Sequence, residues 1–378
     1  MKRYIPCLFL LFLLIVSCRQ KAASDDHSFV VEVYKPACAS GFSIWGAEGQ
    51  KSTIIEVTDP WQSANRVTMR YFVARNGELP PEGFDGVVVP AGAHRIVCMS
   101  SSYVGMLDAL SEASRIVGVS GLEFISSAYV TAHKDSIRDV GVELDFEILL
   151  GLKPELVLLY GVNDAQAAIT DKLNELSIPY MYVGEYLEEK PLGRAEWLVA
   201  LAEVLDVRHK AELLFTEIRQ RYDDCRSLVA GVKNRPSVML NTPWNDSWAM
   251  PADCSYMVNL LQDAGADYVF RGKSKTSLSQ IGMETAYVLL TKADYWLNIG
   301  ACTTMRELVD MDSHFSDAKA VKNHRVYNNN RRLTPGKGND FWESSVVYPD
   351  RILKDLIHIF HPEKLTEADT LYYYRHLE

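Results

Sequence analysis

Short apolar strands alternate with helices in two separate stretches of this chain, and this alternation narrows the folds available to it. In the first stretch we predict strands at 95–99, 116–119, 156–160 and 178–183. In the second stretch we predict strands at 237–241, 295–299 and 325–327. Strands at this spacing run parallel and are joined by helical crossovers, which cover both faces of a sheet. The sequence therefore predicts two three-layer α/β lobes.

A long amphipathic helix separates the two stretches. Between Lys210 and about Ala230, apolar residues recur at intervals of three and four, namely Phe215, Ile218, Tyr222, Cys225 and Val229. Gly231 and Pro236 end the helix. We therefore expect an N-terminal lobe at 94–194, a linker helical region at 195–234 and a C-terminal lobe at 235–378.

Residues 28–93 differ in composition from the two α/β stretches and are rich in β-branched and aromatic residues. We predict strands at 29–34, 52–57 and 67–73, punctuated by Asp59-Pro60 and Pro80-Pro81. This pattern indicates a β-rich extension, an antiparallel meander that packs onto the main body.

The first residues are typical of an export signal. Lys2 and Arg3 precede an apolar run from Leu8 to Val16, which is too short to span a bilayer. The tetrad that ends at Cys18 resembles a bacterial lipobox, in which the cysteine is lipid-modified. We expect a signal peptide at 1–17, a lipidated tether at 18–27, and a membrane-anchored protein on the periplasmic or cell-surface side. An ordinary signal peptide with a chance cysteine is the alternative.

Charge and cysteine usage exclude several classes of function. The formal net charge is −10, and such an acidic chain does not favour nucleic acid. Beyond the signal region the five cysteines are scattered without a C-x-x-C pair, which permits a disulfide but indicates neither a disulfide framework nor a zinc site. They are Cys38, Cys98, Cys225, Cys254 and Cys302.

No catalytic or metal motif is present in the sequence. Arg271-Gly-Lys-Ser274 ends like a phosphate-binding loop, but the preceding glycine, Gly265, is too far away. The chain has no G-x-S-x-G or H-E-x-x-H motif, and among its histidines only His358 and His361 are closely spaced. We therefore expect a protein that is not an enzyme and that carries no cofactor or metal of its own.

Several motifs together resemble one family. They are Arg95-Ile-Val-Cys-Met-Ser-Ser-Ser, Arg115-Ile-Val-Gly-Val, the run from Phe146 through Lys153-Pro-Glu-Leu-Val-Leu, Ala320-Val-Lys-Asn-His-Arg-Val-Tyr, and His361-Pro-Glu. With the predicted lobes and linker helix, residues 94–363 resemble the helical-linker (class III) periplasmic binding proteins. The resemblance implies an ABC-importer receptor that takes up iron–siderophore complexes, haem or cobalamin, and the segment 28–93 lies outside it.

In such a fold, ligands bind in loops at the carboxyl ends of the strands. The candidates in the first lobe are Ser100, Ser101, Ser102, Tyr103, Tyr160, Gly161, Asn163 and Tyr186. Those in the second lobe are Trp244, Trp248, Ala301 to Thr303 (which includes Cys302), Asn330 to Arg332 (which includes Arg331), and Trp342. Helix capping is the alternative role for the serines, core packing for Tyr160, and surface solvation for one of the two arginines.

The resemblance also implies a docking role for Glu147 and Glu284, which occupy equivalent places in the two lobes. The matching glutamates of the family pair with arginines of the permease. A favourable interaction with a helix amino terminus is the alternative reading.

For the ligand we rank a ferric siderophore first, cobalamin second and haem third. An anionic iron chelate would use Arg331 or Arg332, whereas cobalamin would rely on tryptophan and tyrosine faces. The expected partners are therefore a permease, a small-molecule metal chelate and a membrane reached through the lipid, with the protein itself a monomer. A surface lipoprotein that binds a protein partner through the β extension is the alternative from another class.

Overall fold

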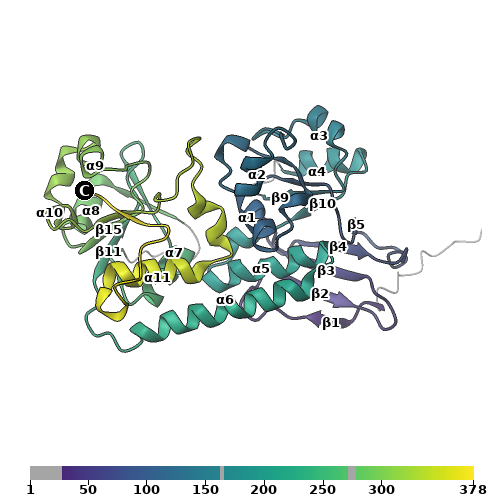
Figure 1. Ribbon diagram of the computed structural model, residues 1–378, viewed down its shortest axis with the longest axis horizontal. Helices are drawn as coiled ribbons and strands as arrows, with labels where there is room; N and C mark the ends of the chain where they lie inside the picture. Colours follow the sequence, from purple (N-terminus) through teal and green to yellow (C-terminus); the bar gives the residue numbers. More distant parts are fainter. Residues whose placement is uncertain (1–27, 162–165, 271–277) are drawn as a thin grey trace, which may run out of the picture.

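The computed structural model describes residues 28–161, 166–270 and 278–378. The signal peptide, the tether with Cys18, and Asn163 lie outside the described residues. Two α/β lobes lie side by side, and a further sheet stands beside the first lobe (Figure 1). The predicted fold class is confirmed.

The N-terminal residues form a five-stranded sheet in the order β1-β2-β3-β4-β5. Its strands are β1 (Val31–Tyr34), β2 (Phe42–Gly46), β3 (Thr53–Thr58), β4 (Thr68–Ala74) and β5 (Val87–Pro90). The first four pair antiparallel, but β5 pairs parallel to β4, with Tyr71 opposite Val87. The expected simple meander is therefore wrong at its last step, because the connection at 75–86 is long enough to return the chain to the same end of the sheet.

This sheet shares a core with the first lobe. Phe42 and Ile55 belong to the same buried cluster as Trp197 and Leu201 of helix α5 (Pro191–Val204). The fully buried Glu196 carboxylate on α5 accepts hydrogen bonds from the amides of residues 37, 38 and 39 at 2.6–2.7 Å. The sheet is therefore fixed to the first lobe through both apolar packing and a buried polar anchor.

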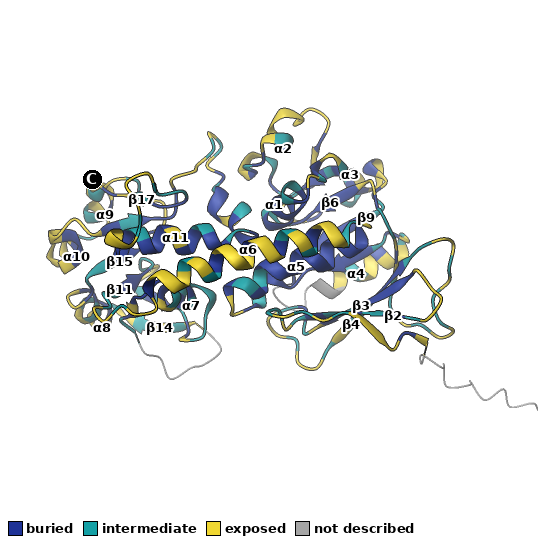
Figure 2. Ribbon diagram, turned by 60° about the horizontal axis from the view of Figure 1, so that its bottom comes forward, coloured by how far each residue is buried: buried dark blue, intermediate teal, exposed yellow. Residues whose placement is uncertain are grey.

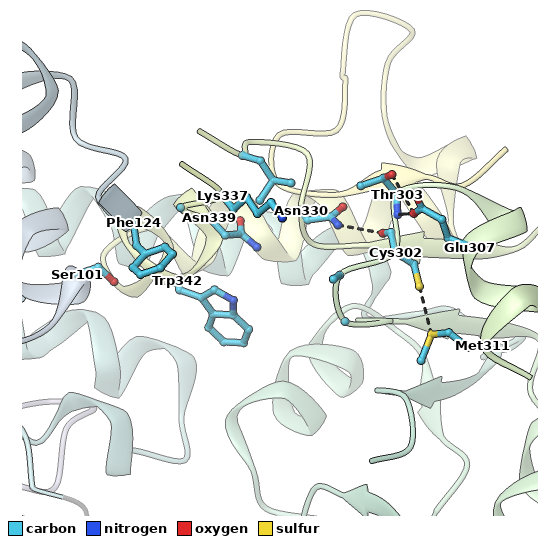
Figure 3. Close-up of a pocket in the computed structure, with 14 residues that line it drawn as sticks. Ser101, Phe124, Cys302, Thr303, Glu307, Met311, Asn330, Lys337, Asn339 and Trp342 are labelled. Atoms are coloured by element: carbon cyan, nitrogen blue, oxygen red, sulfur yellow. Dashed lines mark hydrogen bonds between the residues drawn. The ribbon is translucent and has the colours of Figure 1, made fainter. Parts of the chain in front are cut away.

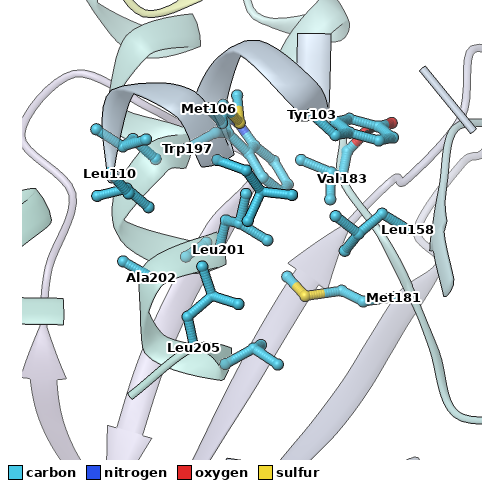
Figure 4. Close-up of a cluster of buried hydrophobic side chains, with 14 of the residues drawn as sticks. Tyr103, Met106, Leu110, Leu158, Met181, Val183, Trp197, Leu201, Ala202 and Leu205 are labelled. Carbon is cyan, nitrogen blue, oxygen red and sulfur yellow. Dashed lines mark hydrogen bonds between the residues drawn. The ribbon is translucent and has the colours of Figure 1, made fainter. Parts of the chain in front are cut away.

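The first lobe is built on a parallel sheet in the order β10-β9-β6-β7-β8. Its strands are β6 (Ile96–Cys98), β7 (Ile116–Val119), β8 (Arg138–Asp139), β9 (Leu156–Leu159) and β10 (Tyr180–Tyr182). Helices α1 (Ser101–Ala109) and α5 pack on one face, as Figure 4 shows for Tyr103, Met106 and Leu201 against Leu158 and Met181. Helices α3 (Phe146–Leu152) and α4 (Gln166–Glu175) contribute to a separate core on the other face. The short helix α2 (Ala128–Ala132) lies at the periphery.

Helix α6 (Arg208–Val229) runs along both lobes and connects them (Figures 1 and 2). Phe215 and Ile218 of its apolar stripe lie in the core of the first lobe, whereas Tyr222 and Val229 lie in the core of the second. The predicted stripe is therefore the seam that joins both lobes. Helix α5 packs mainly in the core of the first lobe, although its Leu192 also contacts the core of the second.

The second lobe is built on the sheet β13-β11-β15-β16-β17, in which only β17 is antiparallel. Its strands are β11 (Ser237–Leu240), β13 (Asp267–Tyr268), β15 (Tyr295–Leu297), β16 (Val326–Asn328) and β17 (Arg375–His376). A separate two-stranded antiparallel sheet consists of β12 (Ser247–Met250) and β14 (Ser279–Gly282). The helices are α7 (Tyr256–Asp263), α8 (Met283–Leu290), α9 (Met305–Met311), α10 (Lys319–Lys322) and α11 (Pro349–Phe360).

Residues 329–347, here called the crossing segment, reach from the second lobe back to the first. Val346 and Val347 at its end are buried in the core of the first lobe. A Cβ atom added at Gly105 of α1 would lie 2.3 Å from the Glu343 carbonyl oxygen, so the two backbones approach as closely as only glycine allows. The lobes are therefore joined by this segment as well as by α6.

Candidate functional site

A cavity of about 980 Å³ lies between the two lobes, and side chains from both lobes line it (Figure 3). Ser101 and Phe124 come from the first lobe. The second lobe and the crossing segment supply the rest, including residues 300–303, Glu307, Met311, Asn330, Leu333, residues 337–339 and Trp342. The cavity is large enough for a ligand bigger than a simple ion.

The cavity lies where parallel strands end. Ser101 follows β6, Phe124 follows β7, the loop at 300–303 follows β15, and Asn330 follows β16. Loops at the carboxyl ends of strands in facing α/β lobes meet in this way. Of the predicted residues, the structure thus brings six into one lining, namely Ser101, Ala301, Cys302, Thr303, Asn330 and Trp342.

Aromatic and apolar side chains form much of the lining. Phe124 is 49% exposed and Trp342 is 63% exposed, although both are large hydrophobic residues. Trp342 packs edge-on against the buried Phe341, with ring centroids 4.9 Å apart. Exposed rings of the first lobe and of the crossing segment are suited to contact the apolar surface of a large ligand.

An asparagine pair shapes the polar side of the cavity. Asn328 donates to the carbonyls of Gly300 and Cys302, at 2.9 and 2.8 Å. Asn330 donates to the Cys302 carbonyl at 3.0 Å, while its Oδ1 is buried and has no hydrogen-bond partner among the described residues (Figure 3). The bonds from Asn328 and Asn330 to the Cys302 carbonyl fix the loop that lines this side of the cavity.

Glu307 lies at the start of α9 and is held by its capping box. Its carboxylate accepts hydrogen bonds from the Thr303 amide at 2.6 Å and from the Thr303 hydroxyl at 3.0 Å. These bonds, the amide first, lower the pKa of Glu307 below its ordinary value. The residue therefore stays ionised at neutral pH and fixes the loop that carries Cys302 and Thr303.

The serines after β6 divide between capping and lining. Ser100 accepts a hydrogen bond from the Ser102 amide as the N-cap of α1. The Ser102 hydroxyl donates to buried Glu185 at 2.6 Å and does not reach the cavity. Burial raises the pKa of Glu185 to about 7. Only Ser101 of the three lines the cavity.

Two predicted ligand residues are buried core residues instead, which corrects the expectation for them. Tyr103 is fully buried, and its hydroxyl donates to the carbonyls of Leu159 and Val183. Trp248 is fully buried in the second lobe, and its indole donates to the Leu240 carbonyl at 2.9 Å. Neither side chain can contact a ligand in this conformation.

The expected cations do not line the cavity either. Arg332 pairs with Asp340 at 2.6 Å and lies over the ring of Tyr372 at 4.4 Å. Arg331 is exposed beside it and is absent from the lining. Lys337 is the one lysine or arginine among the described lining residues.

The remaining predicted residues lie elsewhere. Tyr160 is half-buried and packs against both cores of the first lobe. Gly161 accepts a hydrogen bond from the Tyr186 hydroxyl, and Tyr186 lines a second cavity. Trp244 is 80% exposed in the turn before β12, outside both cavities.

Sequence reasoning missed Phe124, Glu307, Met311 and most of the crossing segment. Phe124 follows β7, so the rule that selected Ser101 after β6 would have found it as well. The crossing segment gives no such signal, because it lines the cavity through a long-range contact between the lobes.

Glu147 and Glu284 are both exposed in the first turns of α3 and α8. Asp145 caps α3 through the amides of Glu147 and Ile148, so the Glu147 carboxylate is not needed for capping. Both carboxylates are accessible to a partner.

Within the described ranges, no group of three or more histidine, cysteine, aspartate or glutamate residues could hold a metal ion. No disulfide joins the five cysteines there. Of the helices described, none has the length and apolar character to cross a membrane.

Residues 96–332 match the family model of periplasmic binding proteins. An uncharacterised lipoprotein of Methanocaldococcus jannaschii is 25% identical over 296 residues, which cover 75% of this chain and 68% of that protein. A second uncharacterised protein of that organism is 22% identical over 264 residues, 67% of this chain and 77% of that protein.

Solved structures share the fold at low identity. A periplasmic binding protein from Veillonella parvula has a TM-score of 0.61 at 16% identity, and the match covers 83% of this chain and 99% of that one. A periplasmic haem-binding protein from Pseudomonas aeruginosa has a TM-score of 0.57 at 19% identity, covering 74% and 96%. The periplasmic vitamin B12-binding protein of Vibrio cholerae has a TM-score of 0.53 at 16% identity, covering 71% and 97%.

Proposed function

Since the chain belongs to the family of periplasmic binding proteins, we propose that it is the extracytoplasmic receptor of an ABC importer and that it captures a large, weakly charged metal chelate in the interlobe cavity. The observation that carries this proposal is the cavity of about 980 Å³ between the lobes, lined by Phe124 of the first lobe and by Trp342 of the crossing segment. The family consists of substrate-binding proteins, so no catalytic step is part of the proposal.

The charges of the lining favour a ligand of low net charge. Lys337 and Glu307 are the charged residues of the described lining, and their charges balance. The anionic chelate favoured by the sequence would need a cation at the ligand, but Arg332 is already paired with Asp340. We therefore rank a chelate with little or no net charge above a strongly anionic siderophore complex.

Two chelate classes meet this description, a cobalamin-type corrinoid and a neutral ferric hydroxamate siderophore. The aromatic side chains of the lining favour the corrinoid, which has flat apolar faces. Haem ranks lower, because no tyrosine or histidine of the described residues lines this cavity to serve as an axial ligand.

Docking and anchoring complete the proposal. Glu147 and Glu284, one on each lobe, would pair with guanidinium groups of the permease, since charge-assisted pairs orient a docking surface. Lipid on Cys18 would hold the protein at the membrane, and two or more acyl chains suffice for stable anchoring.

Titration of the purified full chain with four probes tests the ligand. The probes are cyanocobalamin, a neutral ferric trihydroxamate, a ferric tris-catecholate trianion and haemin. We expect one-to-one binding of cyanocobalamin or the trihydroxamate and no binding of the trianion. Binding of the trianion alone, or of none of the four, would overturn the proposed ligand class.

A further inference from the structure

A pocket of about 550 Å³, here called the basic pocket, lies in the second lobe where its parallel strands begin. It is lined by the loop at 231–236 after α6, by the residues that start β15 and precede β16, and by residues 360–364 at the end of α11. Helices α6 and α11 finish at this end of the lobe (Figure 1). The first cavity lies at the opposite edge of the same sheet, where the strands end, and the two share no lining residue.

Cations outnumber carboxylates in the basic pocket. Lys233, Arg325 and Lys364 are exposed in its lining, and Glu363 is the one carboxylate among the described lining residues. Within the described residues none of the three cations forms an ion pair, and Glu363 approaches Nδ1 of His361 at 3.9 Å. This excess of positive charge is local, because the whole chain carries a formal net charge of −10.

The carboxylates next to the basic pocket are already paired with other cations. Asp267 pairs with Arg235 at 2.8 Å, and Asp294 pairs with Lys319 at 2.6 Å. The lining does not include any of these four residues. The pocket therefore keeps the charges of its own three cations.

The guanidinium of Arg325 is held in position by an aromatic support. It lies over the Tyr295 ring at 5.2 Å from the ring centre, and Tyr295 packs edge-on against the buried Phe360, with ring centroids 5.2 Å apart. No hydrogen bond of the Arg325 guanidinium is found in the described parts of the chain. Its N–H groups are therefore available to a ligand.

His361 fixes the backbone that carries Lys364. Its ring is buried, and Nε2 lies 3.0 Å from the Gly265 carbonyl oxygen. The Lys364 amide donates to the His361 carbonyl at 2.9 Å in the short 3₁₀ helix Pro362–Lys364. This helix therefore holds the backbone of Lys364 at the pocket, while the lysine side chain stays free to reach an anion.

An anion with two charges suits this lining. With His361 left aside, three cations and one carboxylate leave an excess of two positive charges. A phosphomonoester carries about two negative charges at neutral pH. A guanidinium binds two phosphate oxygens in parallel, whereas a lysine acts as a point charge beside them.

We propose that the basic pocket is a second ligand site, which binds the phosphate group of a phosphomonoester through the guanidinium of Arg325 and the ammonium groups of Lys233 and Lys364. The site is separate from the chelate site, because it lies at the far edge of the second sheet.

Calorimetry with glycerol 3-phosphate on the full chain at low ionic strength tests the site. Singly charged glycerate and uncharged glycerol are the matched probes. We expect one-to-one binding of glycerol 3-phosphate with a dissociation constant below about 1 mM, binding of glycerate weaker by about tenfold, and no binding of glycerol. Added salt should weaken the binding, because the pocket is open to solvent.

Arg325→Gln should weaken phosphate binding about tenfold or more and Lys364→Gln about threefold, since each removes a charge-assisted contact. Lys292→Gln, a change at an exposed lysine of the same lobe outside the lining, should leave the binding unchanged. Lys364→Gln alters an exposed side chain without an ion pair among the described residues, so its fold should be intact, and a thermal melt checks both variants.

Absence of glycerol 3-phosphate binding, equal binding of glycerate, or wild-type affinity in both site variants would overturn the proposal. A parallel titration with water-soluble dihexanoyl phosphatidic acid separates two sources of the phosphate. Affinity no higher than that of glycerol 3-phosphate indicates a free phosphate ester, and higher affinity indicates a lipid headgroup, and both support the site. None of these outcomes depends on the ligand of the first cavity.

Discussion

The Glu343 carboxylate accepts a hydrogen bond from the Ser126 amide at 2.6 Å, so a side chain of the crossing segment holds a loop of the first lobe. Glu343 is 2% exposed, and burial raises its pKa to about 8. Asp340 and Asp108 raise the pKa further by repulsion, while the amides of Ser126 and Ser127 act in the opposite direction. The contact between the lobes therefore includes a group that titrates near neutral pH.

The stability of the protein should fall as the pH rises from about 5 to about 8. An acid whose pKa is higher in the folded than in the unfolded state binds its proton preferentially in the folded state, so ionisation favours unfolding. Glu343→Gln keeps an acceptor for the Ser126 amide and removes the titration. We expect this variant to gain on the order of 1–3 kcal/mol relative to wild type at alkaline pH, measured by urea unfolding.

The matched control for that measurement is Glu82→Gln, a change at an exposed glutamate. Its pH profile should follow the wild type. If the profile of Glu343→Gln also runs parallel to the wild type, the titration of Glu343 does not contribute to stability.

Glu196 should be needed to hold the N-terminal sheet to the first lobe. Its carboxylate accepts hydrogen bonds from three backbone amides and from the Tyr34 hydroxyl. Glu196→Ala leaves these buried donors unpaired, at a cost of about 3 kcal/mol or more. Hydrogen exchange should then accelerate over residues 31–46, with Glu217→Ala on the exposed side of α6 as the neutral control. Equal protection in the two variants would refute this anchoring role.

Glu147 and Glu284 should matter for transport and not for ligand binding. Both lie on the surface and outside both cavities, so the double alanine variant should bind ligand as the wild type does. Its stimulation of the permease ATPase in reconstituted vesicles should be reduced about tenfold, since two charge-assisted contacts are lost. Glu143→Ala, an exposed change near α3, serves as the control. Loss of ligand affinity in the folded double variant would place these residues in the binding site instead.

The lobes should move little on ligand binding. Helix α6 is continuous over 22 residues and its stripe is buried in both cores, and the crossing segment adds a second connection. A continuous helix resists the hinge bending that extended strands allow. Small-angle scattering with and without ligand should give superimposable curves. A clear decrease in the radius of gyration on ligand binding would show that α6 and the crossing segment allow the lobes to close.

The sheets and the linker could be predicted because their signals are local. The stripe from Phe215 to Val229 is a periodicity within one helix, and each long strand of the two lobes is an apolar run. Strands β8, β13 and β17 have two residues each, too few to show a pattern.

The side chains of the site depend on contacts between distant residues, which local patterns do not show. Trp244 and Trp248 look alike in the sequence, but Trp248 occupies an inward position of β12 while Trp244 lies in the turn before it. Arg332 forms an ion pair with Asp340, and this pairing depends on how the crossing segment folds back. The fold therefore followed from periodicity, whereas the charge of the cleft did not.

The most direct test of the central claim is the affinity of the bound chelate for two tryptophan variants. Trp342 is exposed on the wall of the first cavity, while Trp244 is exposed outside both cavities. With the probe that binds best, Trp342→Leu should weaken binding about tenfold or more, because a ring contact is lost, and Trp244→Leu should have no effect. Equal affinities of the two folded variants would contradict binding in the interlobe cavity.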